Sequence, residues 1–163
     1  MAGELPEQLA TRVAREKGME VASRVSQSVV LSADTIVTID GKILGKPRDE
    51  AEAFRMLKKL SGRQHSVCTA ICVINQPKEQ ILEGLDRTEV WFRRLSDEEI
   101  AHYLQRENVL DKAGAYAIQG YAGVYIPKIE GNYFNVMGLP LPLVYEFLCR
   151  KMGKGEEVRS QKF

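Results

Sequence analysis

The chain has few cysteines, and their arrangement excludes two classes of small protein. Only three are present among 163 residues, at Cys68, Cys72 and Cys149. An odd and sparse set makes no disulfide framework, and no histidine or second cysteine pair completes a zinc pattern. Cys68 and Cys72 lie four residues apart in an apolar run, so they would share one face of a strand. We expect them to be small buried side chains in a reducing compartment.

Long apolar runs and a leader-like N-terminus are also missing. No apolar stretch approaches the ~20 residues that a membrane-spanning helix needs. Residues 1–8 are polar and contain two glutamates, unlike a secretory signal peptide. The sequence therefore predicts a soluble cytoplasmic protein with no membrane partner.

The chain has no excess of charge of either sign. Its 23 Lys and Arg residues and 22 Asp and Glu residues are interspersed and leave a net charge of +1, which argues against a nucleic-acid partner. Hydrophobic residues make up 44% of the chain, enough for a real core. With no internal repeat or low-complexity linker, we expect one domain over residues 1–153 and a polar tail over 154–163.

Helical and extended patterns alternate along the chain. Capping residues and apolar periodicity predict four helices, at 6–25, from Asp49 to Ser61-Gly62, after Ser96, and at 141–152. Leu9, Val13, Met19 and Ala22 would form the buried face of the first. Strands are expected at 28–33, 36–39, 42–44, 65–75, 81–92 and 124–129, with 133–136 as a return strand. The combination predicts an α/β domain with a mixed, twisted sheet flanked by helices.

An acidic and a hydroxyl residue, Asp34 and Thr35, follow the apolar run Val29-Val30-Leu31. A carboxylate at a strand end can hold a divalent metal through its oxygens or accept a proton from an attacking water. Equally, Asp34 could cap a turn or pair with a surface lysine. Spacing alone leaves both interpretations open.

Lys46 lies in a Gly-Lys-Pro turn, where the proline limits the backbone freedom of the loop. This suits a fixed positive charge over phosphate oxygens, although a solvated loop lysine fits the residues as well. The turn is no Walker motif, because the Gly-x4-Gly-Lys-Ser/Thr pattern is absent.

A third polar group comprises Asp111, Lys112 and Gln119, among glycines and small residues that let a backbone approach a ligand. Gln119 offers a donor and an acceptor to a base edge, Lys112 could contact phosphate and Asp111 a metal. An ordinary polar surface loop is the alternative. The two histidines, His65 and His102, form no recognisable triad.

Five ordered blocks of residues carry a resemblance to the Maf family of nucleoside triphosphate pyrophosphatases. The match extends over residues 6–150, and its blocks are Ala33-Asp34-Thr35-Ile36-Val37, Gly45-Lys46-Pro47-Arg48-Asp49, Leu60-Ser61-Gly62-Arg63-Gln64-His65-Ser66-Val67, Asp111 to Gly120, and Val136-Met137-Gly138-Leu139-Pro140-Leu141. Such order across the chain is far more specific than any single motif. The resemblance implies an inosine-triphosphatase-like α/β fold.

The resemblance also implies an activity and roles for particular residues. It implies hydrolysis of a nucleoside triphosphate to the monophosphate and pyrophosphate, with a divalent cation, Mg²⁺ or Mn²⁺. Asp34 matches the family's catalytic acidic position and would also be the metal ligand, and Lys46 and Lys17 match its phosphate-side lysines. Thr35 and Gln119 match positions associated with nucleotide choice, and Lys112 is a further substrate-binding candidate.

The Ala-Tyr-Ala-Ile-Gln-Gly form at 115–120 resembles the subgroup that acts on dTTP and UTP in a house-cleaning role. The resemblance further implies a homodimer, and some family members are called septum-formation inhibitors. The family's first strand and Ser-x-Ser-Pro-Arg-Arg loop have no counterpart in this sequence. We therefore expect a truncated form of an active enzyme, with a non-catalytic nucleotide-binding or regulatory short form as the alternative.

Overall fold

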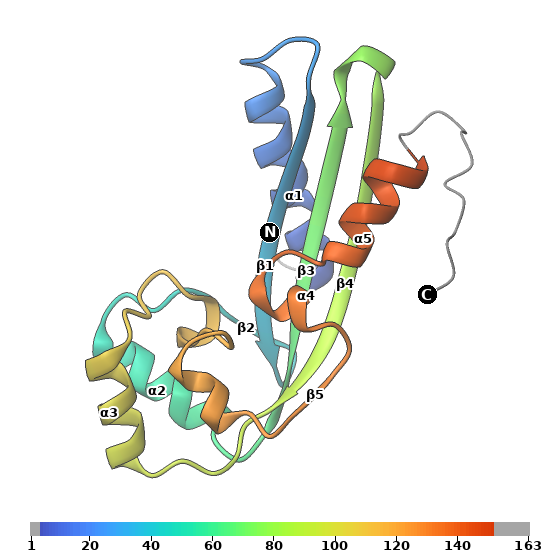
Figure 1. Cartoon of the computed structure of the whole chain (residues 1–163). Helices are drawn as coiled ribbons and strands as arrows, with labels where there is room; N and C mark the ends of the chain where they lie inside the picture. The colour runs from blue at the N-terminus through green and yellow to red at the C-terminus, as the bar shows by residue number, and fades with distance from the viewer. Residues whose placement is uncertain (1–3, 152–163) are drawn as a thin grey trace.

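The computed structural model of the protein describes residues 4–151, and its elements are arranged as in Figure 1. The strands are β1 (Val29–Ile39), β2 (Lys42–Leu44), β3 (Gln64–Asn75), β4 (Gln80–Trp91) and β5 (Lys128–Glu130). The α-helices are α1 (Pro6–Ala22), α2 (Glu50–Leu60), α3 (Asp97–Arg106), α4 (Tyr133–Met137) and α5 (Leu141–Tyr145). Short 3₁₀ segments lie at Gln76–Lys78, Ala113–Ala115 and Tyr121–Tyr125, and a π-helical segment, Glu146–Lys151, follows α5.

The five strands form one sheet in the order β2-β1-β3-β4-β5. The central strand, β3, is buried over nearly its whole length, as the apolar sequence of 65–75 predicts. The α/β class is confirmed. Every pairing in the described part of the chain is antiparallel, and the parallel pairs of a mixed sheet are not found there. Hairpins join β1 to β2 and β3 to β4, whereas the pairs β1–β3 and β4–β5 are formed by segments farther apart in the chain.

Three apolar clusters hold the elements together. Helix α1 covers one face of the sheet, where it meets Ile36, Cys68 and Cys72, and both cysteines are free and buried as expected. Val144 and Phe147, in α5 and the segment after it, cover the opposite face. The largest cluster lies at one end of the sheet, where α2 and α3 form a separate lobe (Figure 1).

The buried face of α1 differs from the expected one. Small residues, Ala10, Ala14 and Gly18, face the sheet, whereas Met19 is exposed. A Cβ atom on Gly18 would lie 2.6 Å from Ser32 Oγ, and that hydroxyl donates to the carbonyl of Ala14 at 2.7 Å. The helix therefore lies too close to β1 for large side chains, and close packing replaces the expected Leu and Met stripe.

The two expected strands at 28–33 and 36–39 are one continuous strand, β1. Asp34 therefore lies mid-strand, opposite Ala70 of β3, and the expectation of a strand end is wrong. On its other side β1 pairs with β2 only through Val37–Ile39, after the expected hairpin at Asp40-Gly41. Within residues 4–151 the rest of β1 has no strand on this side, and this open edge of the sheet carries Asp34.

The C-terminal third departs most from the expected strands. In place of a strand at 124–129, the chain forms a 3₁₀ turn and the short β5, and the expected return strand at 133–136 is helix α4. Asn132 accounts for this helix, because its side-chain oxygen accepts from the amide of Phe134 at 2.9 Å and caps it. The expected tail at 154–163 lies outside the described residues, and no helix within 4–151 is long and apolar enough to cross a membrane.

Candidate functional site

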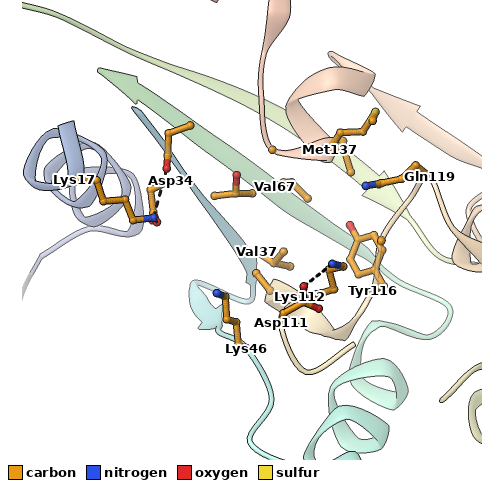
Figure 2. Close-up of a pocket in the computed structure, with 16 residues that line it drawn as sticks. Lys17, Asp34, Val37, Lys46, Val67, Asp111, Lys112, Tyr116, Gln119 and Met137 are labelled. Atoms are coloured by element: carbon orange, nitrogen blue, oxygen red, sulfur yellow. Dashed lines mark hydrogen bonds and ion pairs between the residues drawn. The ribbon is translucent and has the colours of Figure 1, made fainter. Parts of the chain in front are cut away.

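A pocket of about 270 Å³ opens at the uncovered edge of β1. Its lining combines charged and apolar side chains from six segments of the chain (Figure 2). The charged residues are Lys17, Asp34, Lys46, Asp111 and Lys112. The apolar and small residues include Ala33, Val37, Val67, Ala113, Ala117, Val136, Met137 and Gly138, and Thr35, Tyr116 and Gln119 complete the wall. All six residues expected to catalyse or bind substrate therefore line one pocket.

The carboxylate of Asp34 is paired with Lys17 of α1. Lys17 Nζ donates to Asp34 Oδ1 at 2.6 Å and to the carbonyl of Ala33 at 3.4 Å. Alternate residues of a strand point to opposite faces, so Asp34 faces α1 whereas Thr35 faces α4. The pocket reaches both side chains because it wraps around the strand edge. The pairing with a lysine, which was the alternative to a functional role for Asp34, is found, and the carboxylate also lines a pocket.

Lys46 lies in the loop after β2 and points into the pocket opposite Asp34 (Figure 2). Among residues 4–151, Lys46 forms no ion pair, so its charge is available to an anion. The loop is tied to the far wall, because the amide of Gly114 donates to the carbonyl of Gly45 at 3.1 Å. The lysine is thus held at the junction of two segments that are distant in sequence.

Asp111 and Lys112 form a second charged pair in the pocket, with Lys112 Nζ donating to Asp111 Oδ2 at 2.7 Å. The hydrogen bond from Lys112, aided by the positive charge of Lys46, lowers the pKa of Asp111. Asp111 is therefore an ionised carboxylate at neutral pH. Because both members of the pair are at the surface, a ligand phosphate could replace Asp111 as the partner of Lys112.

The opposite end of the pocket is apolar and has a single amide. Tyr116, Met137 and Gln119 lie together there, away from Lys17 and Asp34 (Figure 2). The Gln119 side chain is exposed and forms no hydrogen bond within the described residues, so both its donor and its acceptor are free. The pocket thus has one end with Lys17 and Asp34 and another with an apolar wall and a free amide, and the Asp111–Lys112 pair lies beside Tyr116 (Figure 2).

A buried chain of hydrogen bonds orients the hydroxyl of Thr35. Thr69 Oγ1 donates to the carbonyl of Asn135 at 2.9 Å, and it lies 2.9 Å from Thr35 Oγ1. Because the Thr69 proton is used, Thr35 is the donor to Thr69 and keeps only lone pairs for the pocket. The side chain of Asn135 in turn donates to Thr88 Oγ1 and to the carbonyl of Val67. This network fixes α4 against the sheet.

The apolar wall was not predicted from the sequence. Val67 was assigned to a strand, and Val136, Met137 and Gly138 to a return strand and loop; the ordered family blocks include all four, but without a ligand role. Alternation along 65–75 could have indicated that Val67 faces away from Cys68, but nothing local shows that α4 reaches across to it.

Two carboxylates of the pocket, Asp34 and Asp111, are potential cation ligands. No group of three or more His, Cys, Asp or Glu side chains within residues 4–151 could enclose a metal ion. Asp34 nevertheless has one oxygen in the Lys17 hydrogen bond and a second oxygen without a partner among these residues. Mg²⁺ typically takes one or two carboxylates and completes its shell with water and substrate phosphates, so Asp34 fits such an ion.

This fold and pocket define a class of protein: an α/β protein with a lysine-lined cleft suited to a phosphorylated ligand. The family described as Maf-like protein matches residues 2–151. The chain is 49% identical over 151 residues to the dTTP/UTP pyrophosphatase of Syntrophomonas wolfei, covering 91% of this chain and 79% of the relative. It is 46% identical over 143 residues to that of Carboxydothermus hydrogenoformans, covering 88% and 77%. It is 49% identical to that of Thermococcus gammatolerans, covering 91% and 77%. The chain belongs to the Maf family.

Proposed function

We propose that the protein is a nucleoside triphosphate pyrophosphatase that hydrolyses dTTP and UTP to the monophosphate and pyrophosphate. The observation that carries this proposal is the division of one pocket into a lysine-rich end and an apolar end with a free amide. Relatives that are 46–49% identical to this chain over the aligned residues are named dTTP/UTP pyrophosphatases, which supports the same substrates here. We infer that residues 1–153 serve this function as one domain.

At the charged end, Asp34 is the proposed general base. Its free oxygen would take a proton from the water that attacks the α-phosphorus, while Lys17 holds the other oxygen at 2.6 Å and so fixes the direction of the carboxylate. Lys46 and Lys112 would bind oxygens of the triphosphate and stabilise the charge that develops on the leaving pyrophosphate. The chemistry requires the water and the leaving group to be in line with the phosphorus.

We propose a dependence on Mg²⁺ or Mn²⁺, with substrate phosphates supplying oxygens and one lone pair of the free Asp34 oxygen as the protein ligand, which would leave the other lone pair of that oxygen for the proton of the attacking water. A bound divalent cation would neutralise phosphate charge and polarise the phosphoryl oxygens. Lys17 would keep its hydrogen bond to one oxygen of the Asp34 carboxylate, so both side chains would lie next to the substrate phosphates.

At the apolar end, Gln119 would read the base. Its amide can donate to the O4 of uracil or thymine and accept from N3–H, whereas cytosine presents the reverse pattern. Thr35 presents only lone pairs, so it would accept from a donor on the substrate. The free amide and the oriented hydroxyl together favour a pyrimidine with an N–H group.

The proposal is tested by pyrophosphate release from a panel of nucleotides with Mg²⁺ or Mn²⁺. We expect dTTP and UTP to be the best substrates and Asp34→Asn to lower kcat by roughly 10²–10⁴-fold, the usual effect of a general base. Asp40→Asn, in the exposed hairpin, is the matched control and should retain activity. Cleavage of 7-methyl-GTP alone would contradict the assignment of Gln119.

The same experiment separates the enzyme from a non-catalytic nucleotide-binding form. A regulatory module would be stabilised thermally by dTTP without releasing pyrophosphate, whereas the enzyme would do both. The homodimer implied by the family resemblance and the cytoplasmic location expected from the sequence stay predictions, to be checked by light scattering and by cell fractionation.

A further inference from the structure

A buried hydrogen bond lies behind the apolar end of the pocket. His65 Nε2 is 2.7 Å from the hydroxyl of Tyr116, although the two residues are 51 positions apart in the sequence. Both side chains are buried, with 2% and 6% of their surfaces exposed. Their rings meet edge to face, and Phe92 packs against both. This cluster joins β3 to the segment that forms the pocket wall.

The single hydrogen bond of the His65 side chain is the one to Tyr116 among the described residues. Burial lowers the pKa of His65 to about 4, so the imidazole is neutral at physiological pH. Its other nitrogen, Nδ1, has no hydrogen-bond partner among residues 4–151. A neutral imidazole has one donor and one acceptor, and here only the nitrogen that faces the phenol is satisfied. Removing either member would leave a buried polar atom on the other without a partner.

The backbone conformation just before Tyr116 also indicates that tertiary contacts hold this segment in place. Gly114 and Ala115 both have left-handed φ angles, +71° and +62°, and Ala115 is a residue for which this conformation is strained. The surrounding contacts must therefore hold the turn. The Gly114–Gly45 hydrogen bond does so on one side, and the His65–Tyr116 hydrogen bond does so on the other.

Tyr116 contributes directly to the pocket, whereas His65 does not line it. The phenol ring forms part of the wall beside Val67, and Gln119 follows three residues later in the same segment (Figure 2). A shift of the ring would therefore change the width of this end and move the amide that faces the base. Asp34 and Lys17 are at the other end and would be unaffected.

We propose that His65 is a positioning residue for nucleobase selection, which acts by holding the Tyr116 ring as the wall of the pocket next to Gln119. This inference rests on the proposed function, because it assumes that a pyrimidine base occupies the apolar end. It assigns His65 an effect on binding and on discrimination between bases, and no part in the attack on the α-phosphorus.

The test is a double-mutant cycle of His65→Leu and Tyr116→Phe, with steady-state kinetics on dTTP and dCTP. Each single variant should raise KM for dTTP and lower the dTTP:dCTP ratio of kcat/KM by about tenfold, the scale of a small misfit in a binding pocket, with kcat within about threefold. The double variant should show no larger effect than either single one, because both remove the same hydrogen bond. His65→Gln, which keeps a donor and an acceptor, should recover part of the ratio.

Matched controls are available for both residues. His102 lies exposed on α3, and Tyr121 packs against Arg106 outside the pocket lining. His102→Leu and Tyr121→Phe should leave the ratio unchanged. A purely structural role for His65 would lower thermal stability in His65→Leu while the ratio of the folded enzyme stays at its wild-type value, and that result would overturn the proposal. Should His65→Leu fail to fold, Tyr116→Phe alone decides, since it removes one oxygen and keeps the ring.

Calorimetric binding separates this inference from the proposed function. Analogues of dTTP and dCTP with a methylene in place of the α–β bridging oxygen are bound without turnover. If the wild-type chain releases no pyrophosphate, the proposed activity fails, yet Tyr116→Phe must still reduce the preference for the thymine analogue. An unchanged preference in a folded variant would sink the inference alone.

Discussion

At the scale of single residues, two carboxylates of the pocket are each held by a hydrogen bond from a lysine. Lys17 holds Asp34, and Lys112 holds Asp111, each at 2.7 Å or less. Such surface pairs contribute little to stability, with a typical value of about 0–1 kcal/mol. Their value is therefore in the direction they give to the carboxylates, and substitutions there should separate activity from stability.

Lys17→Met tests this separation, since methionine keeps the length of the side chain and removes its charge. We expect kcat/KM for dTTP to fall by roughly 10²-fold or more, because a group that orients the base and stabilises phosphate charge is lost. The free energy of unfolding should change by no more than about 1 kcal/mol. Lys58→Met, which breaks the exposed ion pair with Asp97, is the control, and an equal loss of activity there would contradict the assignment.

Gly114→Ala should be destabilising for two reasons. Its φ of +71° disfavours any side chain, and an added Cβ would lie 3.1 Å from Cγ1 of Val37. We expect a loss of about 1–2 kcal/mol in urea unfolding and a higher KM, since Val37 lines the pocket. Gly41→Ala has a similar φ of +69° and open space around it, so the difference between the two variants measures the packing contribution.

At the scale of elements, the close approach of α1 to β1 determines where Lys17 lies. Gly18 is next to Lys17 in the helix, and its missing side chain lets the helix contact Ser32. Gly18→Val should push α1 outward, with a loss of about 1–3 kcal/mol from overpacking and a fall in kcat/KM as Lys17 moves from Asp34. Val21→Ala, on the exposed side of the same helix, should alter neither quantity appreciably.

Some elements were predictable because local signals and packing agree. The Ser96 and Asp49 caps, the Asp40-Gly41 hairpin and the apolar β3 all follow from short-range chemistry. The structure of residues 124–136 was not predictable, because their β-branched and aromatic side chains favour strands locally. There the buried Asn135 and the cap at Asn132 impose a helix through contacts with Thr69 and Thr88, which are over 40 residues away.

At the scale of the whole molecule, burial of His65 predicts a dependence of stability on pH. Its folded pKa of about 4 lies below the ordinary value of 6.5, so the unfolded chain binds the proton more readily between these values. Stability is complete above about pH 6.5 and falls as the pH drops toward 4, by about 3 kcal/mol from this group. Urea unfolding across this range measures it, and Tyr103→Phe is expected to keep the slope that His65→Gln removes.

The residues of the candidate site could be predicted from the sequence, but their arrangement around the edge of β1 could not. The ordered blocks of the family resemblance pointed to Asp34, Lys46 and Gln119, which share one pocket in the structure. The sequence could not indicate that Asp34 lies mid-strand, nor that Thr35 points to the opposite face of the same strand. Nor could it indicate that β2 is only three residues long and leaves residues 29–36 of β1 without a second partner strand among the described residues.

The short β2 has a consequence for amide hydrogen exchange. Amides of β3 are paired on both sides and should exchange only when the whole sheet opens, whereas β1 over residues 29–36 has a neighbouring strand on one side alone. In an antiparallel pair alternate N–H groups face away from the partner, so protection along 29–36 should rise and fall with a period of two residues. From Val37 onward, where the pairing with β2 begins, the oscillation should cease. Exchange along this one strand would therefore show, residue by residue, where the sheet ends and the mouth of the pocket begins.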